Sequence, residues 1–183
     1  MSLSRAGSNS KAVDMKNIVI LGFMGTGKTA VSRVLADLLN MKLVSTDEMI
    51  EEKEGSAIND IFAKKGEPYF RNVEREVIKE VSLMKDAVID AGGGVVLDDK
   101  NMENLRVNGI LFRLKAAPDV ILERTSRYAH RPLLNVADPM GMIKKLLEKR
   151  EVYYEKADFH IETSGRNVKD VANEIIQVYR HAL

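Results

Sequence analysis

The feature that most constrains this chain is a glycine-rich turn between an apolar run and an amphipathic segment. The apolar run is Ile18 to Leu21, and the turn reads Gly-Phe-Met-Gly-Thr-Gly-Lys-Thr from Gly22 to Thr29. This is the P-loop spacing Gly-x-x-x-x-Gly-Lys-[Ser/Thr], in which glycines let the backbone curl until several N–H groups point at one phosphate. The sequence therefore predicts a buried strand, a phosphate-binding turn and a helix, in that order.

The residues of this turn suit a nucleoside triphosphate. Lys28 supplies a mobile cation for the outer phosphates, and the Thr29 hydroxyl is suited to ligate Mg²⁺. The helix that begins here directs its positive end at the same anion. A plain glycine turn is the alternative, but the spacing, the Lys-Thr pair and the following amphipathic helix all favour a P-loop. We expect ATP and Mg²⁺ at Gly25, Thr26, Gly27, Lys28, Thr29 and Ala30.

Composition excludes several other classes of protein. The 183 residues fit one ordinary domain with a sizeable core. The absence of cysteine excludes disulfides, thiolate zinc sites and a cysteine nucleophile. A formal net charge of +1 argues against a dedicated nucleic-acid binder. No apolar stretch approaches the roughly 18 residues of a membrane span, and no secretory signal pattern is present. We expect a monomer in the cytoplasm.

Beyond the first residues, strand-like runs alternate with helical periodicity. Residues 1–14 are polar and aperiodic, so we expect a disordered or artificially added arm, with Met15 as the natural start. The predicted strands are Ile18 to Leu21, Met41 to Val44, Ala87 to Asp90, Asn108 to Leu114 and Phe159 to Glu162. After the P-loop helix, helices are predicted from about Asp47, and over Ile58 to Met84, Pro118 to Arg127, Asp138 to Lys156 and Val168 to Arg180. The alternation predicts an α/β fold, a three-layer α/β/α sandwich with a mostly parallel five-stranded sheet that binds ligands at the carboxyl ends of its strands.

Further motifs follow the P-loop in an order that resembles the shikimate kinase family. They read TDEMIEEKEGSAINDIFAKKGEPYFRNVE, AGGGVV, RTSRYAHRPLL and EKREVYY. The combination of Gly-Glu-x-x-Phe-Arg, Gly-Gly-Gly and Arg-Pro-Leu-Leu is more specific than a P-loop alone. The resemblance spans nearly everything from Lys16 to Arg166. It implies a fold like that of nucleoside monophosphate kinases, as a single kinase domain over 15–183 with substrate-binding helices at about 46–84 and a lid at about 125–137.

The resemblance implies that ATP phosphorylates the 3-hydroxyl of shikimate, a step toward the aromatic amino acids. Arg71 and Arg150 resemble the family's carboxylate-binding arginines, because a guanidinium offers a carboxylate two parallel donors. Glu74, one helical turn beyond Arg71, is expected to hold it in place. Asp47 resembles the aspartate that contacts the substrate hydroxyls and accepts the transferred proton. Thr46 and Asp47 also suit a helix cap, and both readings can hold together.

The resemblance also implies roles for a glycine loop and three more arginines. The family's loop beside the substrate and the γ-phosphate is matched by Gly92, Gly93 and Gly94. Arg131 heads the Arg-Pro-Leu-Leu of the lid, where it would close on the γ-phosphate as a third catalytic residue beside Lys28 and Asp47. Arg124 and Arg166 resemble the residues that flank adenine. Phe62 and Phe70 are expected either to line the pocket or to pack in the core.

One departure from the family concerns the metal. The family carries Asp-x-Asp where this chain reads Ser45-Thr46-Asp47, so the first acid, which helps to hold Mg²⁺, is missing. Asp90 ends a buried strand just before the glycine loop, where many P-loop proteins have an acid that holds the metal. We hypothesise that Asp90 replaces the acid lost at Ser45. The alternative is that Asp90 binds only the amides of the glycine loop.

Two other functions stay open at this point. One is a kinase for another small hydroxylated substrate, such as gluconate or a nucleoside monophosphate. Paired arginines favour an acidic substrate, and the arginine of Gly-Glu-x-x-Phe-Arg favours shikimate over a nucleotide. The other is a catalytically silent relative that serves as a ligand sensor or protein-binding module. Ser45 favours this second alternative, whereas Lys28, Asp47 and Arg131 count against it.

Overall fold

A computed structural model describes residues 15–126, 134 and 136–183. The predicted arm at 1–14, and Arg131 with most of the predicted lid, lie outside the described residues. No helix within the described part of the chain has the length and apolar character that crossing a bilayer requires.

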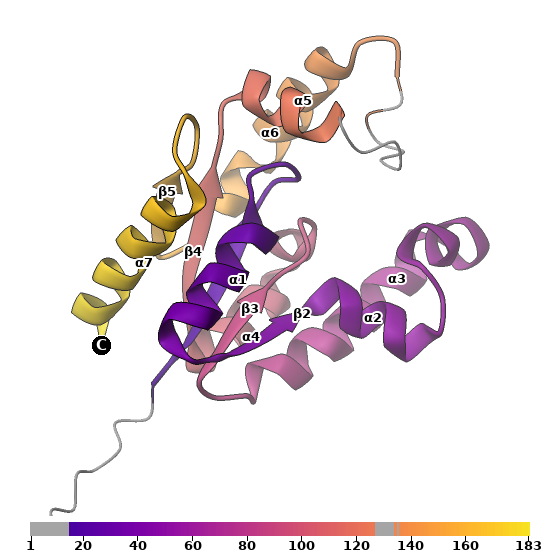
Figure 1. The fold of residues 1–183 in the computed structure, drawn as a ribbon. Helices are drawn as coiled ribbons and strands as arrows, with labels where there is room; N and C mark the ends of the chain where they lie inside the picture. Colours follow the sequence, from indigo (N-terminus) through magenta and orange to yellow (C-terminus); the bar gives the residue numbers. More distant parts are fainter. Residues whose placement is uncertain (1–14, 127–133, 135) are drawn as a thin grey trace, which may run out of the picture.

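Five parallel strands form one sheet in the order β2-β3-β1-β4-β5 (Figure 1). The strands are β1 Asn17–Gly22, β2 Lys42–Ser45, β3 Ala87–Asp90, β4 Gly109–Lys115 and β5 Phe159–Glu162. Each bound lies within one residue of the predicted range. The prediction of a mostly parallel five-stranded sheet is confirmed, and the sheet is parallel throughout.

Helices cover both faces of the sheet and complete the predicted three-layer sandwich. They are α1 Lys28–Leu39, α2 Thr46–Glu54, α3 Ile58–Ser82, α4 Asp99–Asn108, α5 Pro118–Ser126, α6 Pro139–Tyr154 and α7 Val168–Ala182, with a short 3₁₀ turn at Val95–Leu97. On one face, Ile18 and Ile20 of β1 pack with apolar residues of α1 and α7. On the other, Val19 and Leu21 pack with apolar residues of α3, α4 and α6. Because β1 is covered on both sides, it reads as a continuous apolar run rather than an alternating one.

Two helices differ from the prediction. One continuous helix was predicted from Ile58 to Met84, but Gly66 breaks α3 with a left-handed φ of 79°. Glycine adopts this φ without steric cost, and Pro68 then lies in the first turn of the second half, where its missing N–H is harmless. Helix α4 was not predicted at all. Its buried face consists of Asn101, Met102 and Leu105, which is too little apolar periodicity to recognise.

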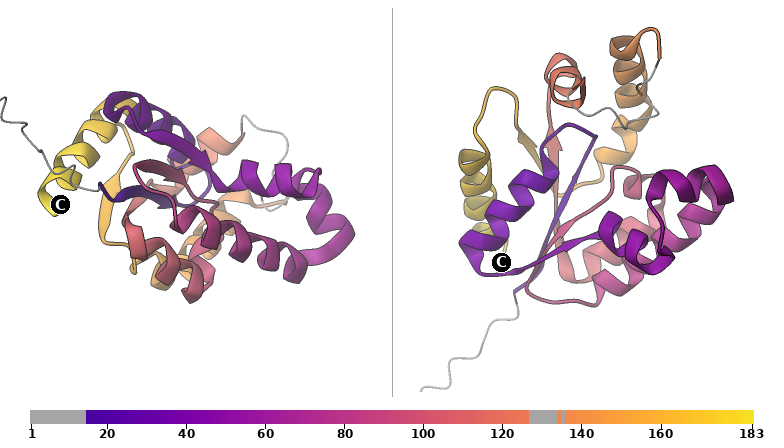
Figure 2. Two further views of the ribbon diagram at one scale, coloured as in Figure 1. Left: turned by 90° about the horizontal axis from the view of Figure 1, so that it is seen from below. Right: turned by 45° about the vertical axis from the view of Figure 1, so that its right-hand side comes forward.

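The carboxyl ends of the strands lie at one edge of the sheet, next to the loops that carry the predicted motifs. In Figure 1 and in the right-hand view of Figure 2, α2 with the first half of α3 lies to one side of this edge, and α5 with α6 lies above it. Strand β1 lies between β3 and β4. The chain builds β2 and β3 on one side of β1 and then β4 and β5 on the other, so the P-loop after β1 stands where the strand order reverses. Open parallel sheets bind their ligands at such a point.

Candidate active site

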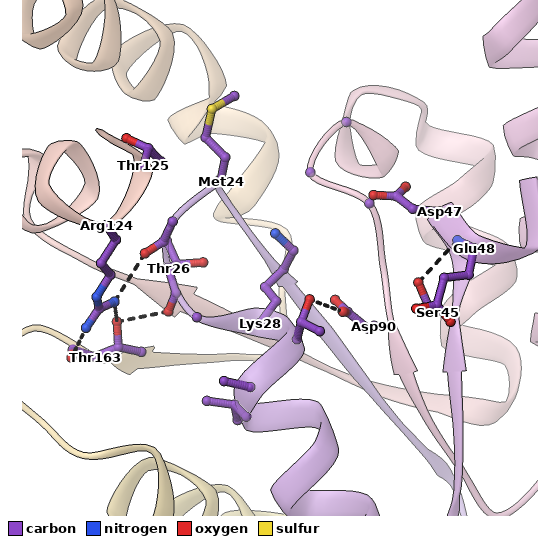
Figure 3. A pocket seen from close by; sticks show the side chains of 18 of the residues that line it. Met24, Thr26, Lys28, Ser45, Asp47, Glu48, Asp90, Arg124, Thr125 and Thr163 are labelled. Atoms are coloured by element: carbon purple, nitrogen blue, oxygen red, sulfur yellow. Dashed lines mark hydrogen bonds between the residues drawn. The ribbon is translucent and has the colours of Figure 1, made fainter. Parts of the chain in front are cut away.

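A cavity of about 880 Å³ opens at the carboxyl edge of the sheet. Its lining includes every predicted site residue that the structure describes. These are 25–30 of the P-loop, Asp47, Arg71, Asp90, 92–94 of the glycine loop, Arg124, Arg150 and Arg166. They come from elements far apart in the sequence, and the fold brings them to one place (Figure 3).

The P-loop joins β1 to α1 through glycines that hold left-handed conformations. Gly25 has a φ of 77° and Gly27 a φ of 93°, which other residues adopt only with strain. Gly27 is also the N-cap residue of α1 and has no side chain to bind the first amides of the helix. These amides therefore remain available to an anion. Lys28 donates to the Phe23 carbonyl at 3.3 Å and points into the space between the P-loop and Asp47 (Figure 3).

Thr29 and Asp90, the two residues predicted to bind the metal, are in direct contact. The Thr29 hydroxyl donates to Asp90 Oδ2 at 2.6 Å, the bond drawn at Asp90 in Figure 3. Asp90 is buried at the end of β3, and Ser45 is its direct partner on β2. The amides of Ala91 and Gly92 donate elsewhere, to the Ile20 carbonyl and the Thr46 hydroxyl. The alternative that Asp90 binds only glycine-loop amides therefore finds no support at these two positions.

The helix cap at the start of α2 differs from the prediction. Thr46 and Asp47 were expected to cap this helix, but both lie inside it, and Ser45 is the N-cap residue. The Ser45 hydroxyl accepts from the Glu48 amide at 3.3 Å. This frees the Thr46 hydroxyl to accept from the Gly92 amide at 2.9 Å. The start of α2 is thus fastened to the glycine loop, and Asp47 stands beside it.

The absence of side chains in the glycine loop lets two predicted substrate-binding residues approach closely. A Cβ on Gly92 would collide with the Asp47 carboxylate, and a Cβ on Gly94 would lie 2.5 Å from Nη1 of Arg71. Neither glycine has a left-handed φ. Space, rather than backbone conformation, therefore explains why these two positions are glycine.

Arg71 is held as predicted. Its Nη1 donates to Glu74 at 2.8 Å, and its Nη2 lies 3.1 Å from Glu67. Burial opposes the charge of Arg71, but the attraction of Glu74 and Glu67 outweighs it and raises the arginine pKa. At Glu74, by contrast, burial prevails over the attraction of Arg71, so the pKa of this carboxyl is raised. The ion pair between Arg71 and Glu74 therefore fixes the position of the guanidinium. The cost of removing the Glu74 carboxylate from water offsets part of their electrostatic attraction.

Arg150 reaches the glycine loop from α6, on a different element from Arg71. Its Nη1 donates to the Gly93 carbonyl at 3.4 Å, and its guanidinium lies 5.6 Å from the centre of the Phe23 ring. Two guanidinium groups therefore border the same loop from α3 and α6. The rings of Phe62 and Phe70 lie 4.5 Å apart and also line the cavity. Phe70 belongs to the buried core as well, so both predicted roles hold for it.

Thr163 is a residue of this site that the sequence analysis did not single out. Its hydroxyl lies 3.1 Å from the Thr26 carbonyl and 2.9 Å from the Lys115 carbonyl. Arg124 donates to the hydroxyl and the carbonyl of Thr163, and to the Gly25 carbonyl, each at 3.2 Å. Thr163 thus ties the P-loop to the ends of β4 and β5. Its place directly after a predicted strand was the signal that could have identified it.

Arg166 lines the same end of the cavity as Arg124 but is held differently. Its Nη1 contacts Glu174 of α7 at 2.5 Å and the Glu162 carbonyl at 3.0 Å. The guanidinium is therefore held by Glu174 of α7 and by the carbonyl of Glu162, the last residue of β5. The adenine-flanking roles of Arg124 and Arg166 remain predictions.

Known proteins are similar to this chain in sequence and in fold. The model of the shikimate kinase family matches residues 24–180. A shikimate kinase from Thermodesulfovibrio yellowstonii is 49% identical over 165 residues, which are 90% of this chain and 95% of that one. The structure of shikimate kinase from Acinetobacter baumannii in complex with shikimate has a TM-score of 0.87 at 38% identity and covers 92% of this chain and 94% of that one.

A more distant match bears on the gluconate alternative. A gluconokinase from Sinorhizobium meliloti covers 91% of this chain and 93% of its own, with a TM-score of 0.56 and 14% identity. A likeness at this level shows a common fold alone. Because the family model spans most of the chain and close relatives align along almost their whole length, the chain belongs to the shikimate kinase family.

Proposed function

We propose that this protein transfers the γ-phosphoryl group of ATP to the 3-hydroxyl of shikimate. The observation that carries the proposal is the lining of one cavity by a P-loop, Asp47, a glycine loop and two guanidinium groups. Membership of the shikimate kinase family and the likeness to a relative solved with shikimate support it. The carboxylate would lie between Arg71 and Arg150, and the triphosphate on the amides of the P-loop.

The reaction needs positioning and charge stabilisation more than a strong base. The 3-hydroxyl oxygen attacks the γ-phosphorus while the bond from that phosphorus to the β–γ bridging oxygen breaks, which releases ADP. The hydroxyl proton passes to the Asp47 carboxylate. Lys28 and the amides at the start of α1 would stabilise the charge on the phosphoryl oxygens. Arg131 lies outside the described residues and remains our predicted lid residue for the same charge.

The residues around Thr29 fit a magnesium ion. Mg²⁺ prefers oxygen ligands and is commonly held by one or two carboxylates, substrate phosphates and waters. Within the described ranges, no group of three or more His, Cys, Asp or Glu is placed to hold a metal by itself. The ion would therefore depend on phosphate oxygens, with the Thr29 hydroxyl as a ligand and the buried Asp90 carboxylate beside it at 2.6 Å. When bound, it would neutralise charge on the transferring phosphoryl group.

Asp90 is our proposed substitute for the acid that the family carries at position 45. Ser45 and Asp90 are direct partners on adjacent parallel strands, so side chains at the two positions lie on the same face of the sheet. A carboxylate at either position reaches the same region next to Thr29. With the carboxylate at position 90 instead of position 45, one negative charge would stay beside the metal, while Ser45 serves as the N-cap residue of α2.

A coupled assay of ADP release tests the proposed function against both alternatives. The purified chain is supplied with ATP and Mg²⁺, and then with shikimate, gluconate or a nucleoside monophosphate in separate reactions. We expect shikimate alone to stimulate ADP release. Stimulation by another acceptor would support the second kinase, and stimulation by none, on folded protein, would support the silent relative. Arg71→Lys serves as a comparison, since lysine cannot form the bidentate pair and should raise the KM for shikimate rather than for ATP.

A further inference from the structure

Two side chains from α6 contact the carbonyl oxygen of Gly93. Tyr154 donates its hydroxyl proton to this oxygen at 3.0 Å, and Arg150 Nη1 approaches it at 3.4 Å. The two residues are one helical turn apart, so they extend from the same side of α6. The tyrosine bond is the shorter, and the arginine contact lies near the limit of a hydrogen bond.

Tyr154 is held rigidly in this position. Its side chain is almost fully buried, at 1% exposure, and packs in the main core. The guanidinium of Arg113, a buried residue of β4, lies 4.9 Å from the centre of its ring. Arg113 also pairs with Glu151 of the same helix at 2.5 Å and with Glu155, the C-cap residue of this helix, at 2.9 Å. These contacts fix the turn of α6 that carries Tyr154 against the sheet.

The hydroxyl of Tyr154 is available as a donor over the ordinary working range of pH. Burial raises its pKa above the usual tyrosine value, and Arg150 and Arg113 only partly oppose this shift. The Gly93 carbonyl therefore keeps a strong neutral partner. A carbonyl with such a partner has less need of a second donor.

We propose that Tyr154 is a positioning residue: it satisfies the Gly93 carbonyl, so that the Arg150 guanidinium can give up its longer contact with this oxygen and turn both of its donors to the substrate carboxylate. The inference rests on the proposed function, because it concerns the carboxylate of shikimate. Without the tyrosine hydroxyl, Arg150 is the nearest donor to a carbonyl that lacks its main partner. Its Nη1 would then be drawn toward Gly93, away from the fork geometry that a carboxylate requires.

The competing explanation is that Tyr154 only anchors α6 in the core. A purely structural role predicts lower stability, with either no change in ligand affinity or an equal change for both substrates. The positioning role predicts a selective loss for the substrate that carries the carboxylate. The two explanations therefore differ in a quantity that can be measured separately from stability.

The test is Tyr154→Phe, which removes one oxygen and keeps the ring in the core. Shikimate affinity is measured by calorimetry on the folded chain, and KM values for shikimate and ATP are measured from ADP release. We expect the shikimate Kd to rise about tenfold, the usual consequence of losing one charge-assisted hydrogen bond, with the KM for ATP unchanged. Tyr153→Phe is the matched control, since Tyr153 is partly buried against the same core but does not line the cavity, and its ring lies 5.5 Å from Lys156 Nζ. It should leave both affinities as they are.

A double-mutant cycle gives a second, independent readout. In an Arg150→Lys background the fork is already lost, so adding Tyr154→Phe should change the shikimate Kd less than about twofold. An unchanged Kd in the single variant, parallel losses for shikimate and ATP, or an equal tyrosine effect in both backgrounds would each overturn the proposal. If the wild-type chain binds no shikimate at all, the proposed function itself fails and the inference with it. If wild type and Tyr154→Phe bind shikimate equally well, the positioning role of Tyr154 is wrong but the proposed function still stands.

Discussion

Exchanging the carboxylate between positions 90 and 45 tests whether the metal-binding acid has moved between strands. Asp90→Asn keeps the shape of the side chain and an oxygen that can accept from Thr29, so the fold should persist. What it removes is one buried negative charge, 2.6 Å from the hydroxyl that would ligate Mg²⁺. Outer-shell carboxylates of this kind typically contribute about 10- to 100-fold to metal affinity. We therefore expect the Mg²⁺ concentration for half-maximal activity to rise by at least about tenfold.

The second half of the exchange restores the charge from the neighbouring strand. Ser45 is the direct partner of Asp90, and adjacent strands lie only about 4.8 Å apart. Ser45→Asp also preserves the N-cap of α2, because aspartate caps helices as well as serine does. The double variant, Ser45→Asp with Asp90→Asn, should recover most of the lost metal affinity. Ser45→Asp alone places two carboxylates side by side and is the matched control for added charge.

The exchange is measured in two ways, so that metal binding is separated from turnover. Binding of Mn²⁺ in the presence of ADP is followed by electron paramagnetic resonance in all four proteins, and ADP release is followed across a Mg²⁺ titration. An Asp90→Asn variant with wild-type metal affinity would refute the reasoning. So would a folded double variant that binds Mn²⁺ no better than Asp90→Asn.

Three other changes have outcomes that follow from single contacts. Gly92→Ala drives its Cβ into the Asp47 carboxylate, so kcat should fall at least about tenfold with little loss of stability, and a wild-type kcat would contradict the steric argument. Burial raises the pKa of Glu74, so the folded chain retains a proton that the unfolded chain releases, and wild-type stability should fall as the pH rises above the ordinary value of 4.5. Denaturant unfolding between about pH 4.5 and 8 should show this fall in the wild type but not in Glu74→Gln, and equal slopes would exclude it. Glu151→Ala removes one of the carboxylates that pair with the buried Arg113, so the free energy of unfolding should fall by about 2 kcal/mol. Arg113→Met should cost less, because it leaves no buried charge. Urea unfolding that shows the larger loss for Arg113→Met would disprove this.

The sequence predicted most of the sheet and the site because both follow strong local patterns. The strands β1 and β3 are short apolar runs that end in residues with evident chemistry, the P-loop glycines and Asp90. Parallel strands bring such ends to one edge, so the order of motifs along the chain was enough to predict a common cavity. Arg71 and Glu74 could be paired in advance because residues three apart on a helix are neighbours.

The features that escaped prediction depend on tertiary contacts. In α4 the polar residue Asn101 occupies a buried position, so the apolar periodicity that would have predicted this helix is missing. The roles of Ser45 and Thr46 could not be separated, because which of them caps α2 depends on the Gly92 amide that Thr46 binds. Thr163 acquires its function only where β4, β5 and the P-loop meet. The partners of Thr46 and Thr163 lie far away in the sequence, where no local pattern could indicate them.

Identification of the product tests the central claim most directly. The wild-type chain is incubated with ATP, Mg²⁺ and shikimate, and the product is examined by phosphorus–proton correlation in nuclear magnetic resonance. We predict a single phosphate ester at ring carbon 3, formed in step with ADP. Phosphate at another hydroxyl, or ADP release without any phosphorylated shikimate, would contradict the arrangement of Asp47, the glycine loop and the two arginines described above.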